Sequence, residues 1–310
     1  MIKAGISLGL GASQPLASLT STIQHAADAG FTHVELISRN LNVMMNGDLN
    51  PVRLEALTRA IADAPVAFTL HGSEVSSSRG GNLMDITTST QIEIFKADLA
   101  LAKAIGAGIL VYHSGTLREP GGDPSAIKSG MAAERDRLRI LGDLAGESGI
   151  TIAVENRDPV GRYIVRHAYG ISLSRLAEQV SAIDHPQVGV CLDFGHGFLG
   201  CSYLGVDFLD EVRNIAPLVS HIHLSDNFGK PNLDETSDAS ENLVKGLGDL
   251  HLIPGWGVIP HDDLAEIPFP RHPIANLEMR ANFFEHLDLA AQQVIGFATR
   301  VANTLAVTAN

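Results

Sequence analysis

The sequence predicts a single (β/α)8 barrel, a closed parallel sheet of eight strands, as one domain over residues 1–310. Three observations predict it. The length suits one barrel with room for loops, since such barrels commonly need about 250 residues. Short apolar runs alternate with helical patterns along the whole chain, and strict βα alternation is typical of a parallel sheet. There are eight such units of about 39 residues each, with no linker or low-complexity tract between them.

In chain order, the expected strands are Lys3–Leu8, His33–Ile37, Val66–Leu70, Ile109–Tyr112, Thr151–Val154, Val188–Leu192, Val219–Leu224 and Ala275–Leu277. The helical patterns between and after them are Leu16–Ala29, Pro51–Asp63, Ser89–Ile105, Ala126–Ser148, Leu173–Ser181, Asp207–Leu218 and Phe283–Val307. Gly30, Gly106 and Gly149 follow helices, where left-handed C-caps are expected. An open doubly wound sheet would typically carry a glycine-rich phosphate turn after its first strand, and Gly9-Leu10-Gly11 is only a faint echo of one.

Composition excludes several classes of protein. Apolar residues make up 45 % of the chain and charged residues 18 %, which excludes disorder of the whole. The 22 basic and 35 acidic side chains give a net charge of −13, which argues against nucleic acid as the main partner. No apolar run is long enough to span a membrane. Two cysteines, Cys191 and Cys201, cannot form a disulfide framework, so we expect a reducing, cytoplasmic location. The sequence leaves open whether the chain forms a homo-oligomer.

Residues of the metal-binding kind stand at six consecutive expected strand ends. They occur in Leu70-His71-Gly72, Tyr112-His113-Ser114, Val154-Glu155-Asn156-Arg157, Leu192-Asp193-Phe194-Gly195-His196, His221-Ile222-His223 and Leu277-Glu278. In a parallel barrel these ends share the C-terminal rim, where active sites are built. One such residue could simply form a hydrogen bond in the barrel, but six in succession indicate a site. Carboxylates and neutral imidazoles together favour Mn²⁺, Co²⁺ or Zn²⁺ over calcium. The sequence therefore predicts a divalent metal at this rim.

These blocks carry a family resemblance. Together with Ser225-Asp226-Asn227 and Asp249-Leu250-His251-Leu252-Ile253-Pro254-Gly255-Trp256-Gly257, they resemble the xylose isomerase-like TIM-barrel superfamily over nearly the whole chain. That superfamily contains sugar isomerases and epimerases together with the endonuclease IV DNA-repair enzymes. The motifs are specific for the superfamily and are shared by several activities.

The resemblance implies a set of metal ligands. The core that is common to the superfamily would be Glu155, Asp193, His223 and Glu278. The endonuclease branch adds ligands for a cluster of three metals, and the matching positions are His71, His113, His196, Asp249 and His251. All nine residue types are present, although isomerase-like members keep several of them with fewer metals.

We expect a metal-dependent sugar isomerase or epimerase. Such an enzyme moves a proton through an enediolate on a small polyhydroxylated carbonyl compound. Glu155 and Glu278 are the natural acid and base, because carboxylates can both bind a metal and shuttle protons. Arg157 and His196 are expected to orient hydroxyls, and Lys230 is a further polar candidate. The arginine that some epimerases place near Lys230 is absent. No cluster of basic residues marks a phosphate pocket, which favours an unphosphorylated substrate.

Three alternatives remain. The first is an endonuclease IV-like, multi-zinc phosphodiesterase acting on abasic DNA. The long irregular segment Ser225–Pro260 contains a flap, Gly229–Gly248, and an acidic flap beside the metal would repel a polyanion. Its acids are Asp234, Glu235, Asp238 and Glu241, against Lys230 and Lys245. The second alternative is a sugar-binding barrel without turnover. The third is a lyase or dehydratase that uses the same enolate chemistry.

Some residues near these strand ends have ordinary structural explanations. His221 shares the strand parity of His223, so it should point into the barrel one layer below and form hydrogen bonds there. Trp256 either walls the substrate pocket or packs within its own turn. Tyr163, in the loop after the fifth strand, could reach over the site, as could other residues of that loop.

Overall fold

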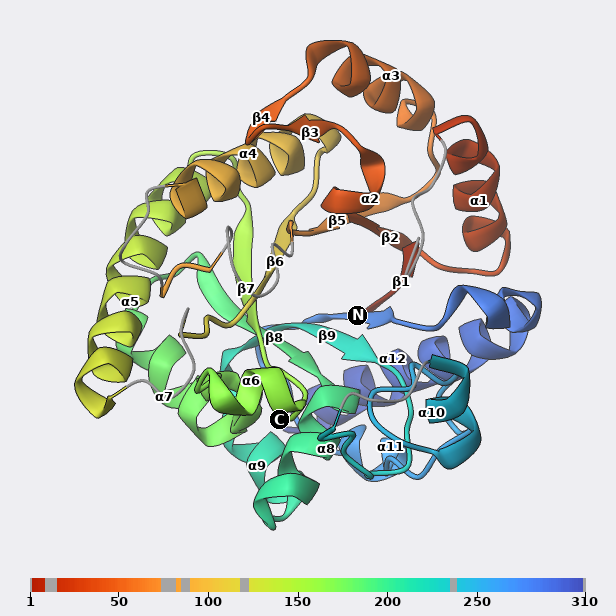
Figure 1. The fold of residues 1–310 in the computed structure, drawn as a ribbon. Helices are drawn as coiled ribbons and strands as arrows, with labels where there is room; N and C mark the ends of the chain where they lie inside the picture. The colour runs from red at the N-terminus through yellow and green to blue at the C-terminus, as the bar shows by residue number, and fades with distance from the viewer. Residues whose placement is uncertain are drawn as a thin grey trace.

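The structure, a computed structural model, describes residues 2–8, 16–73, 82–84, 90–117, 123–234 and 239–308. Its main sheet is a closed barrel in the order β1-β10-β9-β8-β7-β6-β5-β2, and every neighbouring pair in it is parallel. Helices surround this barrel on its outside (Figure 1). The predicted (β/α)8 barrel is therefore confirmed. The Gly9-Leu10-Gly11 turn lies outside the described residues.

The barrel strands are β1 (Lys3–Leu8), β2 (His33–Ile37), β5 (Ala67–His71), β6 (Ile109–His113), β7 (Thr151–Glu155), β8 (Val188–Asp193), β9 (Val219–Leu224) and β10 (Ile274–Leu277). The helices that cover the barrel and match predicted patterns are α1 (Leu16–Asp28), α3 (Pro51–Ile61), α4 (Thr90–Ile105), α5 (Pro124–Gly146), α7 (Leu173–Ile183), α9 (Phe208–Ile215) and α12 (Leu287–Thr308). Each predicted strand is present, and most bounds agree within one or two residues.

Four strands end one residue later than predicted, and each added residue is a candidate ligand. The last residues of β5, β6, β7 and β8 are His71, His113, Glu155 and Asp193. The ladder pairs His113 with Glu155, and Asp193 with His223. These side chains are thus fixed by the hydrogen-bonded sheet itself, which gives them a more rigid placement than a loop would.

Several short elements were not predicted. They are α2 (Ser38–Leu41), the hairpin β3 (Met44–Met45) with β4 (Asp48–Leu49), α6 (Gly161–Val165), α8 (Phe194–Leu204), α10 (Ala239–Lys245) and α11 (His261–Leu264). Short 3-10 helices lie at Tyr169–Ile171, Ala216–Leu218 and Ala281–His286. The second of them ends the predicted helix Asp207–Leu218 early, because Pro217 cannot continue an α-helix.

The apolar core lies between the barrel and its helices. On α12, for example, Val294, Phe297 and Val301 are buried in it. Inside the barrel, Ile109, Val111, Ala153 and Cys191 form a separate small apolar cluster. Cys191 is thus a small, fully buried residue of the barrel interior.

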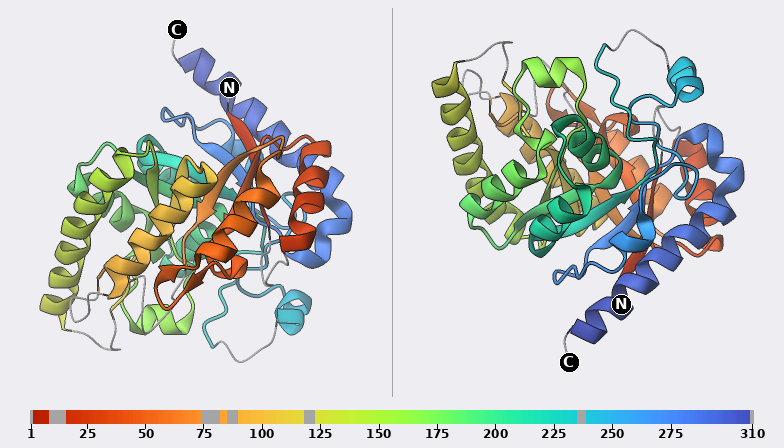
Figure 2. Two further views of the ribbon diagram at one scale, coloured as in Figure 1. Left: turned by 90° about the horizontal axis from the view of Figure 1, so that it is seen from above. Right: turned by 90° about the horizontal axis from the view of Figure 1, so that it is seen from below.

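Two of the unpredicted helices mark the functional end of the barrel. Figure 2 shows α6 and α10 on the face opposite the two chain termini. The first follows β7, and the second belongs to the flap between β9 and Asp249. No helix within the described ranges combines the length and the apolar character that a membrane crossing requires.

Candidate metal centre

Four donors converge on one point at the end of the barrel, and we call them the central group: Glu155, Asp193, His223 and Glu278. Their donor atoms lie within 4.8 Å of one another. His223 Nδ1 lies 2.9 Å from Glu155 Oε1 and 3.5 Å from Glu278 Oε1. The four side chains come from β7, β8, β9 and the end of β10 and are all buried. The structure thus brings together the core ligands that the sequence predicted.

Asp193 is held in place by its backbone neighbours. Its Oδ1 accepts a hydrogen bond from the His196 backbone N–H at 2.6 Å, as the N-cap of α8. The Asn156 side chain accepts from Asp193 N–H and donates to Asp193 C=O, which joins β7 to β8. Gly195 allows this close approach, because a Cβ at this position would lie 2.5 Å from Ser225 Oγ and would displace that hydroxyl. The second oxygen, Asp193 Oδ2, makes no hydrogen bond to the described part of the chain.

Two further histidines lie near the second carboxylate oxygen of Glu155, Oε2. His113 Nε2 lies 2.8 Å from Glu155 Oε2, and His71 Nε2 lies 3.4 Å from the same atom. These three residues form a further set of donors within 4.8 Å of one another. Glu155 thus belongs to both sets of donors.

An outer group, His196, Asp249 and His251, lies at the edge of the same site. Asp249 Oδ2 is 3.3 Å from His196 Nε2 and 2.6 Å from His251 Nε2. Asp249 Oδ1 is buried and has no hydrogen-bond partner among the described residues. His251 has a φ of 45°, in the left-handed region that a non-glycine residue rarely adopts, and such backbone strain concentrates at functional sites.

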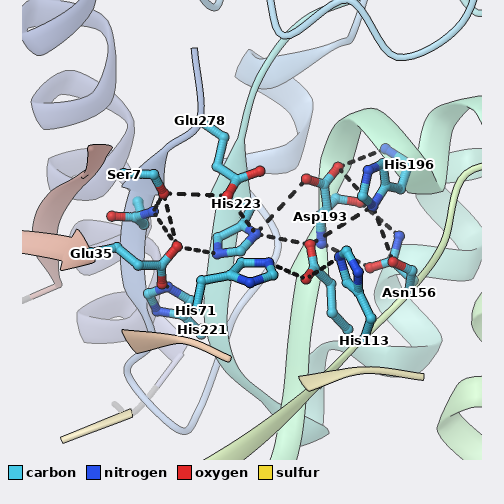
Figure 3. A network of polar contacts seen from close by, with 12 residues as sticks. Ser7, Glu35, His71, His113, Asn156, Asp193, His196, His221, His223 and Glu278 are labelled. Carbon is cyan, nitrogen blue, oxygen red and sulfur yellow. Dashed lines mark hydrogen bonds and ion pairs between the residues drawn. The ribbon is translucent and has the colours of Figure 1, made fainter. Parts of the chain in front are cut away.

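Beneath the central group lies a polar layer that contains His221, as predicted, and Glu35, whose contacts the sequence did not predict. Glu35, on β2, is its hub, with Oε1 3.1 Å from His223 Nε2 and Oε2 2.9 Å from His221 Nε2. Ser7 Oγ and Thr69 Oγ1 donate to the same carboxylate at 2.8 and 3.1 Å. The predicted interior position of His221 is confirmed. The sequence did give one signal for Glu35. It is an acidic residue in an otherwise apolar strand, at a position whose side chain points into the barrel. Figure 3 shows His223 between Glu35 and Asp193, with Glu278 beside it.

The electrostatics of the site favour a bound cation. Burial acts to raise the pKa of the Glu155 carboxyl, but the facing His113 and His223 outweigh it and hold that pKa well below its usual range. Burial, reinforced by Asp249 and Glu155, raises the pKa of Asp193 to about 6, although His196 acts in the opposite direction. Several buried carboxylates at such short range repel one another unless positive charge lies between them. Together with the unmatched oxygens of Asp193 and Asp249, this donor set fits a divalent metal.

The centre opens into a cavity of about 420 Å³, which we call the rim cavity. It is lined by Ile37, Arg39, His71, His113, Arg157, Asp158, Val160, Arg162, Tyr163, His196, Asn232, Asn242, Gly248, Asp249, His251 and Glu278. The predicted substrate residues Arg157 and His196 are among them, and so is Tyr163. Lys230 and Trp256 are not. Lys230 is exposed, and Trp256 packs edge-on against Phe283 and His286 at ring-centroid distances of 5.3 and 5.2 Å.

The fold and this buried donor set define a barrel with a candidate metal centre at its C-terminal rim. The family model described as "Xylose isomerase-like TIM barrel" matches residues 23–267, so the chain belongs to the xylose isomerase-like TIM barrel family. A comparison with curated protein sequences finds no match.

Solved structures of the same fold include enzymes of more than one kind. A D-tagatose 3-epimerase-like protein aligns with a TM-score of 0.69 at 17 % identity, covering 97 % of this chain and 98 % of the other. A D-psicose 3-epimerase solved in the presence of D-fructose gives 0.66 at 15 %, covering 97 % and 99 %. The probable 3-DHS dehydratase AsbF from Bacillus anthracis gives 0.65 at 16 %, covering 95 % and 99 %. At these identities the likeness shows the shared fold.

Proposed function

We propose that this protein is a divalent-metal-dependent sugar isomerase or epimerase. One observation carries the proposal: Glu155 and Glu278 both belong to one four-donor group directly beneath a small walled cavity. A divalent metal bound there would supply a Lewis acid that stabilises negative charge on a substrate oxygen. The likeness in fold to a D-psicose 3-epimerase and to a D-tagatose 3-epimerase-like protein supports this assignment.

The two glutamates differ in their access to a substrate. Glu278 lines the rim cavity, so its carboxylate can take the proton next to a carbonyl directly. Glu155 is fully buried and does not line the cavity, but His113 does, and its Nε2 lies 2.8 Å from Glu155. We therefore assign proton removal to Glu278 and proton return to Glu155 acting with His113. Arg157 and His196 would orient the substrate at the cavity wall.

Exchange of the α-proton with solvent tests this without knowledge of the sugar. The protein, loaded with Mn²⁺ or Co²⁺, is incubated in D₂O with a panel of aldoses and ketoses, and loss of α-proton signal is followed by nuclear magnetic resonance. We expect exchange with at least one sugar. Glu278→Gln should slow it by about 10²–10⁴-fold while the fold is retained, because a positioned base contributes that much.

The matched control is Glu178→Gln, an exposed residue on α7 that should leave the rate unchanged. An active Glu278→Gln variant would remove this residue from the mechanism. Binding of a sugar without any exchange would instead support the sugar-binding barrel. A product that has lost one water relative to the sugar would indicate a dehydratase, for which the AsbF neighbour is a precedent in fold.

A second candidate function is a multi-zinc phosphodiesterase acting on abasic DNA. The observation that favours it is that the outer group, His196, Asp249 and His251, lies at the same site as the central group. The observation against it is that Asn232 and Asn242 of the flap line the cavity, which narrows the access that a duplex would need. Cleavage of an oligonucleotide with one abasic site distinguishes the two functions.

The setting of the enzyme is part of the same proposal. We assign it a small-molecule substrate and a reducing, cytoplasmic location, since Cys191 and Cys201 are both free and buried.

A further inference from the structure

Three arginines line the rim cavity, and two of them, Arg157 and Arg162, contact the same tyrosine ring. Arg39 lies in α2 after β2, Arg157 follows β7, and Arg162 lies in α6, and all three line the cavity. We infer that the part of the cavity lined by Arg157 and Arg162 is an anion subsite, and that the substrate is an acidic sugar carrying a carboxylate or a phosphate. This inference rests on the proposed function, because it assigns the substrate class of the same site.

Arg157 provides the strongest observation. Its exposed fraction is only 8 %, and its Nε donates to the Ser114 carbonyl oxygen at 2.6 Å. Its Nη1 is buried and has no hydrogen-bond partner among the described residues. No carboxylate in those residues forms an ion pair with it. A guanidinium stays charged under all ordinary conditions, and a buried charge without a partner is unfavourable. An anionic group of the substrate would satisfy it.

Tyr163 holds Arg157 and Arg162 at the cavity wall. The guanidinium carbon of Arg157 lies 4.5 Å from the centre of the Tyr163 ring, and that of Arg162 lies 4.7 Å from it. Both distances are within the range of cation–π attraction. Because the buried ring orients two planar guanidinium groups, their N–H donors are arranged before a ligand binds. Carboxylates and phosphates are the groups that such donors recognise.

Acidic side chains also line this cavity, and their negative charge opposes the positive charge of the arginines. Glu278 belongs to the central group, so a bound cation would offset its charge, and Asp249 lies within ion-pair distance of His196 and His251. Asp158 also lines the cavity, and burial raises the pKa of its carboxyl while Arg157 and Arg162 act to lower it. Among the described residues that line the cavity, Asp158 is thus the further acid beside Arg157 and Arg162. The sequence suggested no such cluster, because Arg39 and Arg157 are 118 positions apart in the chain.

Isothermal titration calorimetry on the metal-loaded protein tests the inference. The ligands are matched sets: glucose, galactose and mannose, their uronic acids and their 6-phosphates. We expect at least one acidic member to bind about tenfold or more tightly than its neutral partner, which corresponds to one added charge-assisted contact. Preference for the uronates or for the 6-phosphates identifies which anion the subsite takes.

Two substitutions locate the effect. Arg162→Gln, at an exposed residue, should reduce the acid-over-neutral preference several-fold without unfolding the protein. Arg157→Lys keeps the charge but loses the planar pair of donors, so it should reduce the preference as well. The matched control is Arg213→Gln on α9, whose partner is Asp210 and which lies outside the rim cavity. It should change nothing.

The outcomes separate this inference from the proposed function. A panel in which no acidic sugar binds better than its neutral partner overturns the inference, as does a preference that survives both arginine substitutions. If α-proton exchange then occurs with neutral sugars, the proposed function stands alone. Arginine-dependent binding of an acid without any exchange supports the anion subsite and contradicts the isomerase.

Discussion

At the scale of single residues, His223 connects the two polar layers of the barrel. Its Nδ1 faces Glu155 and the other donors of the central group, while its Nε2 lies 3.1 Å from Glu35. A carboxylate on the far nitrogen of a ligand histidine fixes the orientation and tautomer of the ring. Glu35 is itself held by Ser7 and Thr69, so the chain that orients the ligand extends across three strands.

Removal of the Glu35 charge should weaken metal binding. Glu35→Gln keeps the size of the side chain but removes the anion that faces His223, so we expect the metal affinity to fall about 10–100-fold. Titration of the metal-free protein with Mn²⁺ or Co²⁺ in a calorimeter measures it. Thr69→Val, which removes one hydrogen bond to Glu35, is the milder control. An unchanged dissociation constant in Glu35→Gln would mean that Glu35 has no role in orienting His223.

His33 should make the stability of the metal-free protein depend on pH. Burial, with Lys3 and His221 nearby, lowers its pKa from 6.5 to about 4. Between these values the unfolded chain binds a proton that the folded protein does not, so stability is present above pH 6.5 and is lost as the pH falls toward 4. With allowance for solvent screening, the loss is about 2 kcal/mol. Urea denaturation at several pH values measures it. His33→Gln should flatten the dependence, and an identical dependence in both proteins would contradict the assignment.

The residues of the site differ in how far the sequence could reveal them. Glu155 and Asp193 could be predicted, because strand ends of a parallel barrel share one rim and ligand-type residues there are conspicuous. The contacts of Glu35 could not be predicted. The register between strands decides which side chains lie at the same level inside the barrel, and the sequence does not give that register. Arg162 could not be linked to Arg157, because α6 is too short to show a helical pattern.

At the scale of elements, the flap determines what can reach the centre. Asn232 and Asn242 line the rim cavity and are joined by a hydrogen bond of 3.1 Å. The base of the flap is closed by a hydrogen bond from Gly248 N–H to Lys230 C=O at 2.7 Å. Glu235 and Asp238, which contributed to the predicted acidity of this segment, lie outside the described residues.

This closed base allows a clean deletion. Residues 231–247 can be replaced by two glycines, because Lys230 and Gly248 already lie side by side. We expect the shortened protein to fold but to lose most of its activity on sugars, since one wall of the cavity is removed. The α-proton exchange rate and cleavage of abasic DNA are measured on the same preparation. If deletion unmasks DNA cleavage, the phosphodiesterase is the better assignment.

The alternation of the elements, more than their length, made them predictable. Every barrel strand was expected, because an apolar strand between two long helical patterns gives a clear alternation. In contrast, α8 (Phe194–Leu204) was missed since its first turn, Phe194-Gly195-His196-Gly197, is rich in glycine. Its start is set by tertiary contacts: Asp193 caps it, and the small residues allow close approach to Ser225.

At the scale of the whole molecule, closure of the barrel is what assembles the site. Glu35 and Glu278 are 243 positions apart in the chain, yet Ser7 on β1 contacts both carboxylates, at 2.8 and 3.3 Å. The eight repeated units could be counted in the sequence, and the closed barrel that they predict has one shared C-terminal rim. The identity of the substrate could not, because it depends on how the loops after the strands meet above that rim.

The metal content of the purified protein shows whether the central group holds a cation. Inductively coupled plasma mass spectrometry is applied to protein prepared without chelators and without a metal-affinity resin. We predict about one Mn or Co per chain, held by the central group. Two or three Zn per chain would contradict the isomerase and favour phosphodiester hydrolysis, for which the outer group would complete the cluster. A protein that holds no metal and binds none on titration would contradict the account altogether.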